Sequence, residues 1–229
     1  MKNIKYRKYN SYYFGYRDIE DDEFAKIVEK LEHDSLSSSE VLSGRGAVTN
    51  IDLYSGSVVI KSYKRGGLLK HFNKETYIRT GIARNESEFN SLITASEIGI
   101  NVPKPVAFIR KGSLFCRYWL IIEEIKNHQS LTKISNNDEK RTRSLMKNLM
   151  VQVGKLVENN FYHVDLHPGN ILVDSSDNVY IIDFDKAHKT MLNQNALTEK
   201  YTERWIRAVK KYNLSKILIE KFRITNDKI

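Results

Sequence analysis

The sequence has little of what secreted and membrane-spanning proteins rely on. It holds one cysteine, Cys116, so no disulfide can form within the chain, and a reducing compartment is the default expectation. No apolar run approaches the roughly 20 residues of a spanning helix, and the first residues are basic without a continuous apolar segment behind them. We therefore expect a chain that is neither secreted nor threaded through a membrane.

Proline and glycine are also scarce, with 3 and 11 residues in a chain of 229. Hydrophobic residues make up 41% of the chain and charged residues 28%, which is too apolar for a disordered protein. No internal repeat is present, and the one low-complexity tract is the short serine-rich stretch at 35–39. The sequence therefore predicts a globular protein, whose length permits one large domain or two small lobes.

Positive charge exceeds negative charge. Lys and Arg number 37 against 28 Asp and Glu, which gives a formal net charge of +9. Such an excess favours an anionic partner, which at this stage is a nucleotide, an anionic lipid or a nucleic acid. Lysine carried simply for solubility explains the excess equally well.

The first half of the sequence alternates strand and turn signals before its main helix. Residues 43–63 are typical of a strand, a hairpin and a second strand. Residues 84–98 carry apolar residues every three or four positions and end at a glycine, which predicts a helix. The apolar run at 118–125 predicts a buried strand that leads into a polar linker. We expect residues 1–125 to form a small lobe, with an antiparallel sheet and one main helix.

The second half is mostly helical. Residues 140–157 have a strong apolar stripe, and the tail at 197–222 has the same periodicity, so both are predicted helices. Between them, residues 171–173 and 179–182 are short strands around a turn. Residues 126–229 then make a mostly helical lobe, and the two lobes together predict an α+β fold.

The densest group of polar residues is the stretch HVDLHPGN at 163–170, with Asp183 downstream. Phosphoryl transfer needs a carboxylate to orient the attacking hydroxyl and oxygen ligands to hold Mg²⁺ against a triphosphate. Asp165 and Asn170 share this loop, and the two short strands return Asp183 beside them. A loop, a hairpin and a second aspartate in this order are typical of a protein-kinase-like site.

Two other interpretations of the same residues stay open. Taken one at a time, Asp165, Asn170 and Asp183 are ordinary helix caps or turn residues. Alternatively, His163, Asp165 and His167 alternate along the chain, and imidazole with carboxylate suits zinc, which would make the protein a metallohydrolase. The Pro-Gly that follows His167 breaks such a strand at once.

Upstream residues supply what a nucleotide site needs. Gly44 and Gly46 can form a turn whose backbone approaches phosphates, although an ordinary hairpin turn has the same sequence. Lys61 ends a β-branched run and resembles the strand lysine that contacts the α- and β-phosphates. Such a lysine needs an acidic partner on the following helix. We prefer Glu88, which shares a face with apolar residues, over Glu86.

The segments SGRG, VVIKSYKRGGLLKHFNKETYIR, NVPKP, HVDLHPGN and IIDFDKA together resemble the lipopolysaccharide-core kinase family, in particular its 3-deoxy-D-manno-octulosonic acid (Kdo) kinases. The resemblance covers about residues 43–187. It implies a two-lobed protein-kinase-like fold. It also implies transfer of the γ-phosphate of ATP, with Mg²⁺, to the 4-hydroxyl of a Kdo sugar on a lipid A precursor.

The resemblance implies a role for each matching residue. Asp165 would orient or deprotonate the sugar hydroxyl, while Asn170 and Asp183 would hold Mg²⁺. Lys61, paired with Glu88, would contact the phosphates of ATP.

Other positions concern the adenine and the acceptor. Glu123 and Glu124 lie where a strand is expected to contact adenine through its backbone. The residues after Asp183 contain no Ala-Pro-Glu, so the platform that presents peptides in protein kinases is expected to be absent or reduced. His167 stands where protein kinases have a lysine. A small or lipid-borne acceptor fits best, and another small-molecule kinase or a protein kinase is the alternative.

Cations alternate with glycines and apolar residues at 64–72, a pattern suited to an anionic membrane surface or to a solvated loop. Lysines and tyrosines at 2–13 offer a weaker anchor of the same kind. We expect peripheral attachment to the cytoplasmic face of the bacterial inner membrane. A nucleic-acid-binding protein or an inactive kinase-shaped module remains an alternative, but no base-reading module is recognisable. The sequence does not indicate an oligomeric state.

Overall fold

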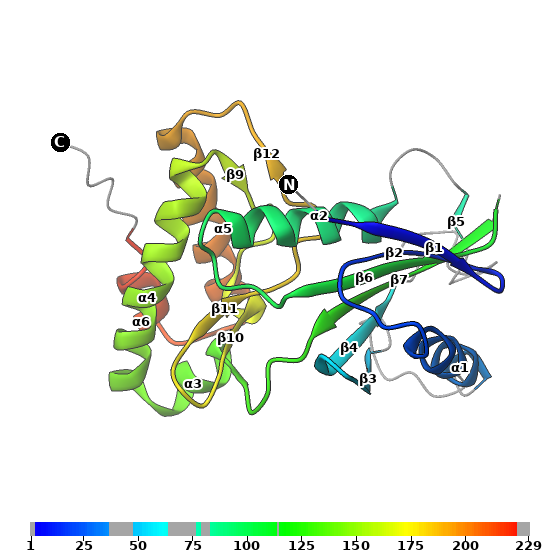
Figure 1. Cartoon of the computed structure of the whole chain (residues 1–229). Helices are drawn as coiled ribbons and strands as arrows, with labels where there is room; N and C mark the ends of the chain where they lie inside the picture. Colours follow the sequence, from blue (N-terminus) through cyan, green and yellow to red (C-terminus); the bar gives the residue numbers. More distant parts are fainter. Residues whose placement is uncertain (1–2, 37–47, 64–76, 79–82, 114, 224–229) are drawn as a thin grey trace. The chain divides into compact units, whose positions relative to one another are not determined.

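The computed structural model describes residues 3–36, 48–63, 77–78, 83–113 and 115–223 (Figure 1). The chain divides into two compact units. The first comprises Met1–Asn90 and Lys104–Glu124, and the second comprises Ser91–Pro103 and Ile125–Ile229.

Residues 91–103 belong to the second unit, whereas the sequence analysis placed them in the lobe of residues 1–125. Hydrogen bonds within the second unit explain the difference. The backbone N–H of Asn101 donates to Gln152 Oε1 at 2.8 Å, and its carbonyl accepts from Ile181 at 3.0 Å. Ser91 Oγ also donates to the carbonyl of Ala187 at 3.0 Å.

The first unit is built on an antiparallel sheet, in which seven strands are described. The order along the sheet is β1-β2-β6-β7-β4-β3, and β5 pairs with β7. The hairpin and strand expected from the sequence are therefore present. The strands are β1 Lys5–Tyr9, β2 Tyr12–Tyr16, β3 Val48–Leu53, β4 Gly56–Ser62, β5 Tyr77–Ile78, β6 Pro105–Lys111 and β7 Phe115–Glu123.

Helix α1, Glu23–Leu36, covers one face of this sheet with an apolar stripe that includes Phe24 and Ile27. These side chains pack with Phe14 of β2 and Ile109 of β6 in the core of the unit. The carboxylate of Glu23 is buried, but it accepts hydrogen bonds from backbone N–H groups, including that of Glu20 at 2.8 Å. Burial of the charge is thus compensated by its partners.

Helix α2, Arg84–Glu97, has nearly the bounds expected from its periodicity. It ends where Gly99 takes a φ of 78°, a conformation that glycine adopts without steric cost. The N–H of Gly99 donates to the carbonyl of Ser96 at 3.0 Å, and that of Ile100 donates to Ala95 at 3.0 Å, which satisfies carbonyls of the last turn.

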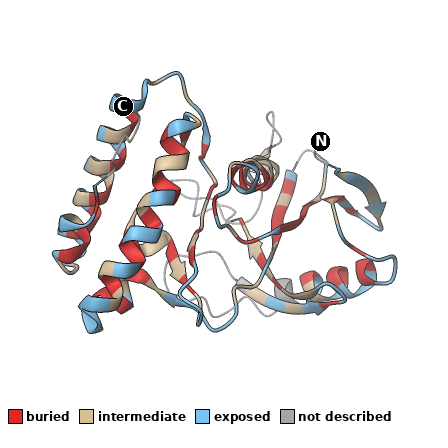
Figure 2. Ribbon diagram, turned by 60° about the vertical axis from the view of Figure 1, so that its left-hand side comes forward, coloured by how far each residue is buried: buried red, intermediate tan, exposed pale blue. Residues whose placement is uncertain are grey.

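The second unit is mostly helical, as expected. Its buried side chains come chiefly from one face of α4 and one face of α5, while the opposite faces are exposed (Figure 2). The α+β fold class is therefore confirmed. The elements of this unit are β8 Gln129–Ser130, α3 Leu131–Asn137, α4 Glu139–Glu158, β9 Phe161–Tyr162, η2 Pro168–Asn170, β10 Ile171–Val173, β11 Val179–Ile181, β12 His188–Lys189, α5 Gln194–Lys211 and α6 Ile217–Glu220.

The expectation of one continuous helix over residues 197–222 is wrong. Helix α5 ends at Lys211, and Asn213 then has a φ of 50°, which no α-helix accommodates. The short helix α6 begins only at Ile217. The apolar periodicity continues across the break because α6 also buries Ile217 and Leu218, so the sequence pattern hides the turn.

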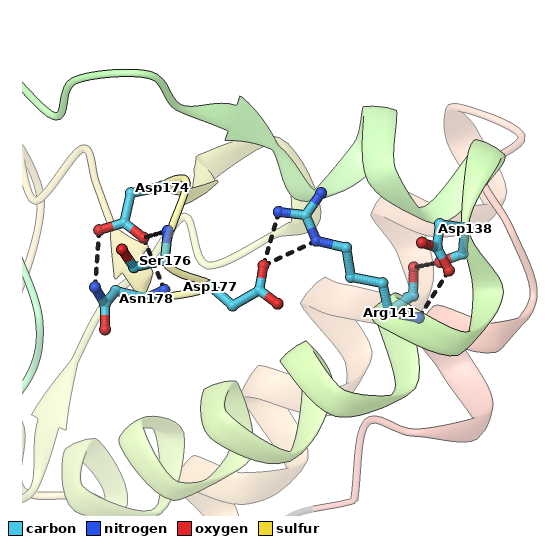
Figure 3. A network of polar contacts seen from close by, with 7 residues as sticks. Asp138, Arg141, Asp174, Ser176, Asp177 and Asn178 are labelled. Atoms are coloured by element: carbon cyan, nitrogen blue, oxygen red, sulfur yellow. Dashed lines mark hydrogen bonds and ion pairs between the residues drawn. The ribbon is translucent and has the colours of Figure 1, made fainter.

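The turn between β10 and β11 is fixed to α4 (Figure 3). Asp174 accepts hydrogen bonds from the backbone N–H groups of Ser176 and Asn178 at 2.8 and 2.9 Å. Arg141 of α4 donates from Nε to Asp177 Oδ1 at 2.8 Å, and Asp138 caps α4 by accepting from the N–H of Arg141 at 2.8 Å. The β10–β11 hairpin, whose two ends carry polar residues of the site, is thus held to a long helix.

Candidate active site

The loop after β9 carries Asp165 and is held in place by hydrogen bonds of buried residues. His163 is buried, and its Nε2 donates to the carbonyl of Ile182 at 3.0 Å. The Tyr201 hydroxyl donates to the carbonyl of Phe161 at 2.7 Å and accepts from the N–H of His163 at 2.9 Å. These bonds fix the segment from Phe161 to His163 that leads into Asp165.

Asn170 and Asp183 are brought together by the β10–β11 hairpin. In this antiparallel pair Ile171 lies opposite Ile181, so the two polar residues follow at the same end. The N–H of Ile182 donates to the carbonyl of Asn170 at 3.0 Å, directly before Asp183. Asn170 and Asp183 therefore lie at the same end of the hairpin, as the sequence spacing predicted.

Asp183 has a φ of 66°, in the left-handed region that most residues with a side chain avoid. Aspartate tolerates this region better than most residues, yet the conformation still carries a cost. Strained backbone of this kind concentrates at functional sites. The backbone conformation therefore marks Asp183 as a candidate functional residue, independently of its place in a motif.

The amide of Asn170 is oriented by a hydrogen bond. Its Nδ2 donates to the backbone carbonyl of Asp165 at 3.0 Å. The oxygen Oδ1 is therefore the atom of this amide that can face a cation, and Asp183 offers a carboxylate from the same end of the hairpin. An amide oxygen and a carboxylate are hard oxygen donors of the kind that Mg²⁺ prefers, so these residues fit this ion.

Asp165 has a partner that the sequence analysis missed. Arg204 of α5 donates from Nε to Asp165 Oδ1 at 3.1 Å, and its Nη2 contacts the same oxygen. His167 Nε2 lies 3.9 Å from the other carboxylate oxygen. Because Arg204 follows Asp165 by 39 positions and belongs to a helix of unremarkable composition, no local signal in the sequence marks it.

This partner controls the ionisation of the carboxylate. Partial burial would raise the pKa of Asp165, but the hydrogen bond and positive charge of Arg204 outweigh it and lower the pKa. Asp165 is thus ionised at neutral pH, as a group that accepts a proton must be. Burial, by contrast, lowers the pKa of His163, which therefore stays neutral beneath the loop.

In the first unit, Lys61 of β4 and Glu88 of α2 form an ion pair. Lys61 Nζ donates to both carboxylate oxygens of Glu88 at 2.9 Å, and the Tyr63 hydroxyl also contacts this carboxylate. Glu88 is only 2% exposed. Of the two glutamates weighed in the sequence, the structure thus places Glu88 against the lysine. A buried carboxylate with these donors holds the ammonium group in one position.

The backbone of Glu123 is engaged in the sheet, with its N–H donating to the carbonyl of Lys104 at 2.8 Å. Glu124 donates from its N–H to Ser57 at 3.0 Å, and its side chain accepts from Asn50 at 2.7 Å. Their contact with adenine remains a prediction. Gly44, Gly46 and the basic segment at 64–72 lie outside the described residues.

The metallohydrolase alternative is not supported. In the part of the chain that the structure describes, no group of three or more His, Cys, Asp or Glu residues is placed to hold a metal. His163 turns into the core, where it contacts the ring of Phe184, and His167 Nδ1 accepts from the N–H of Gly169 at 3.0 Å. The two imidazoles therefore make contacts that stabilise the loop.

Comparisons with known proteins identify the family of this chain. The model of the lipopolysaccharide kinase (Kdo/WaaP) family matches residues 29–220. A 3-deoxy-D-manno-octulosonic acid kinase of Vibrio vulnificus (strain YJ016) is 35% identical over 64% of this chain and 63% of its own length. The protein of that name from Vibrio parahaemolyticus is 31% identical over 74% of this chain and 71% of its own length.

A third similar protein, the 3-deoxy-D-manno-octulosonic acid kinase of Haemophilus influenzae (strain 86-028NP), is 33% identical over 60% of each chain. The matched part of this chain thus spans 63% of the V. vulnificus protein and 60% of the H. influenzae protein. The family match covers most of both units and confirms the protein-kinase-like fold expected from the sequence. The chain belongs to the lipopolysaccharide kinase (Kdo/WaaP) family.

Proposed function

We propose that the protein is an ATP-dependent kinase that phosphorylates the 4-hydroxyl of a Kdo sugar on a lipid A precursor. The observation that carries the proposal is the ionised Asp165, held by Arg204 on a loop that also orients Asn170. The names of the relatives support the acceptor, because three of them are Kdo kinases.

In the proposed reaction, Asp165 accepts a hydrogen bond from the acceptor hydroxyl and orients its oxygen toward the γ-phosphorus. The bond between γ-phosphorus and the β,γ-bridging oxygen breaks, a bond to the sugar oxygen forms, and the hydroxyl proton leaves through Asp165. The products are ADP and a phosphomonoester. Arg204 holds the carboxylate in place and keeps it charged until it accepts this proton.

Asn170 and Asp183 are the proposed ligands of Mg²⁺. When bound, the ion would neutralise negative charge on the phosphates of ATP. Lys61 would contact those phosphates from an ammonium group fixed by Glu88. Gly44 and Gly46 would approach the nucleotide with their backbone, and Glu123 would contact adenine in the same way.

We further propose that the enzyme works at the cytoplasmic face of the inner membrane as a peripheral protein, where a lipid-borne acceptor would be found. Among the described helices, none is long and apolar enough to cross a bilayer. The cations at 64–72 are proposed to contact anionic lipids. Replacing Lys64, Arg65 and Lys70 by glutamine should reduce cosedimentation with anionic vesicles, and unchanged cosedimentation would exclude this segment.

The direct test is mass spectrometry of the acceptor. The protein is incubated with ATP, Mg²⁺ and a Kdo-bearing lipid A precursor, and the expected result is the mass of one added phosphate. Asp165→Ala should abolish this product while retaining ATP binding, because the carboxylate acts on the hydroxyl rather than on the nucleotide. Phosphorylation at the parental rate by this variant would remove Asp165 from the mechanism.

Absence of the product with the parent protein, across several Kdo-bearing glycolipids, would refute the proposed acceptor.

A further inference from the structure

Helix α5 carries four cations on one face. Counted from Lys200, the other three follow at steps of four, seven and eleven residues, and each of these steps returns to nearly the same side of an α-helix. The apolar residues of α5, including Trp205 and Val209, occupy a different face and are buried. We call this set the α5 basic stripe; it consists of Lys200, Arg204, Arg207 and Lys211.

The stripe is fixed to the loop that carries the proposed catalytic residue. Arg204 contacts Asp165, and the buried Tyr201 hydroxyl binds the backbone of that loop from the neighbouring face of α5. Beyond the end of α5, the ring of Tyr212 lies 6.5 Å from that of His167. Helix α5 therefore touches the loop near its middle and at its C-terminal end, so cations of the stripe lie to either side of Asp165 along the helix.

The other three cations of the stripe face solvent. Lys200, Arg207 and Lys211 are exposed, and none of them forms an ion pair with a carboxylate of the described residues. The amine of Lys211 lies 5.2 Å from the centre of the Tyr212 ring, and that ring is the one that lies 6.5 Å from His167. Solvated lysines are common on helices, but here they extend outward from a residue that holds the proposed catalytic carboxylate.

We propose that the α5 basic stripe binds phosphate groups of the acceptor, so that the enzyme selects a hydroxyl flanked by phosphates on the same molecule. The proposal rests on the proposed kinase function and adds to it the class of substrate. Lys200, Arg207 and Lys211 are the specificity-determining residues, and Arg204 is the member that also positions Asp165.

The electrostatics of the loop favour this inference. Asp165, Asp183 and Asp185 place negative charge where the acceptor must approach, and this charge repels an anionic sugar lipid. Cations beside the loop offset that repulsion and attract the substrate. From Lys200 to Lys211 the helix rises by about 16 Å, the scale of a disaccharide head group rather than of one phosphate.

The test compares two variants of equal net charge. In the stripe variant, Lys200, Arg207 and Lys211 are all replaced by glutamine. In the control variant, the exposed Lys133, Lys140 and Lys147 of α3 and α4 are replaced instead, which removes the same charge from other helices of the same unit. Thermal unfolding of both variants establishes that they fold.

Each protein is assayed with a phosphorylated Kdo glycolipid and with the same glycolipid after enzymatic removal of its phosphates. With the phosphorylated acceptor we expect the KM of the stripe variant to rise about tenfold or more over that of the parent, since three exposed ion pairs are lost together. The dephosphorylated acceptor should show a much smaller rise. The KM for ATP should be unchanged, and the control variant should behave as the parent.

Equilibrium binding of the two glycolipids is measured in parallel by their effect on intrinsic tryptophan fluorescence. This second measurement separates the stripe from the proposed chemistry. If the parent binds the phosphorylated glycolipid more tightly than the stripe variant does but never phosphorylates it, the proposed function fails and the stripe stands.

Equal binding and equal KM values in the parent, stripe and control variants would overturn the stripe. A rise in KM of the same size with both acceptors would also overturn it, because the lost interaction would then not involve the phosphates. If the stripe variant instead loses only binding to anionic vesicles that lack the glycolipid, the stripe is a membrane contact and the proposal is wrong.

Discussion

At the scale of single residues, the proposed catalytic carboxylate owes its position to a side chain from a different helix. Arg204 binds Asp165 from α5, and the guanidinium group keeps the carboxylate ionised despite partial burial. Two donors on one oxygen also limit the rotation of the carboxylate. The orientation of Asp165 thus depends on how α5 packs within the second unit.

Arg204→Ala should lower kcat for phosphate transfer on the order of 100-fold, because a catalytic group that loses its positioning partner spends less time in the reactive geometry. Arg204→Lys should retain part of the activity, since an ammonium group restores the charge but not the two-donor geometry. Steady-state kinetics measure kcat for the parent and both variants, and the expected order is parent, then Arg204→Lys, then Arg204→Ala.

Binding of ATP, followed by fluorescence, should be the same in the two variants and the parent. A kcat equal to that of the parent in both variants would show that neither the charge nor the geometry of Arg204 contributes, and would remove it as a positioning residue.

His163 makes stability depend on pH. Burial holds its pKa in the folded state below the ordinary value of 6.5. Below that pH the unfolded chain takes up a proton that the folded chain does not, so stability falls as pH falls from 6.5 toward the lowered pKa, by up to about 1.4 kcal/mol per pH unit. Above pH 6.5 this residue has no such effect.

Urea unfolding at about pH 7.5 and about pH 5.5 measures the effect. In His163→Gln the amide can still donate to the carbonyl of Ile182, but the side chain no longer titrates. We expect the difference in unfolding free energy between the two pH values to be smaller in this variant. A difference as large as that of the parent would show that other groups cause the pH dependence.

The candidate site residues that the sequence predicted to be neighbours are those that lie close together along the chain. Asp165 and Asn170 share one loop, and Asp183 follows a hairpin that folds back on itself, so the sequence spacing alone predicts that they are close in space. Glu88 was preferred from its face on a helix. Arg204 was missed because its contact with Asp165 depends on how α5 packs, and periodicity reports which face is buried but not what an exposed face meets.

At the scale of elements, helices with a long apolar stripe were the easiest to predict. Helices α2 and α4 lie within two residues of their expected bounds, because burial of one face dominates their sequence. The hairpin β1–β2 and helix α1 were not predicted. Strand β1, with the sequence KYRKY, has no clear alternation of apolar and polar residues, and the turn depends on Asn10 at a φ of 52°.

Asp138 ends α3 and begins α4, so one side chain controls the junction of two helices (Figure 3). Asp138→Ala should destabilise the protein by about 1 kcal/mol, because the N–H of Arg141 loses its acceptor. Asp138→Ser retains a capping oxygen and should lose much less. Urea unfolding compares the two, and equal losses would indicate that the cap does not contribute.

At the scale of the whole molecule, the structure shows where part of the net charge of +9 lies, which the composition alone does not. Helix α5 alone has five Lys and Arg against two Glu, which suits an anionic acceptor as well as solubility. The composition could not separate these explanations, because total charge contains no information about where the charges lie.

Nucleotide and metal should stabilise the folded protein together. A ligand that binds only the folded state at about 100 times its dissociation constant adds roughly 2.7 kcal/mol, so ATP with Mg²⁺ should raise the Tm. Removing Mg²⁺ with EDTA should abolish most of this rise. Thermal unfolding with each addition measures it.

Asp183→Asn should bind Mg²⁺ more weakly and show a smaller rise in Tm than the parent at the same concentrations. A rise of the same size, together with the same dependence on Mg²⁺ concentration, would remove Asp183 from the proposed metal site.

The hairpin β1–β2 precedes the segment that the family model matches, and β2 pairs with β6 from Ala107 to Lys111. Without that hairpin, β6 would be an edge strand with a free row of amide and carbonyl groups beside Val106, Ala107, Phe108 and Ile109. Exposed apolar edges of this kind template pairing between chains. The N-terminal hairpin thus replaces an apolar edge strand with β1, whose Lys5, Arg7 and Lys8 disfavour pairing with another chain.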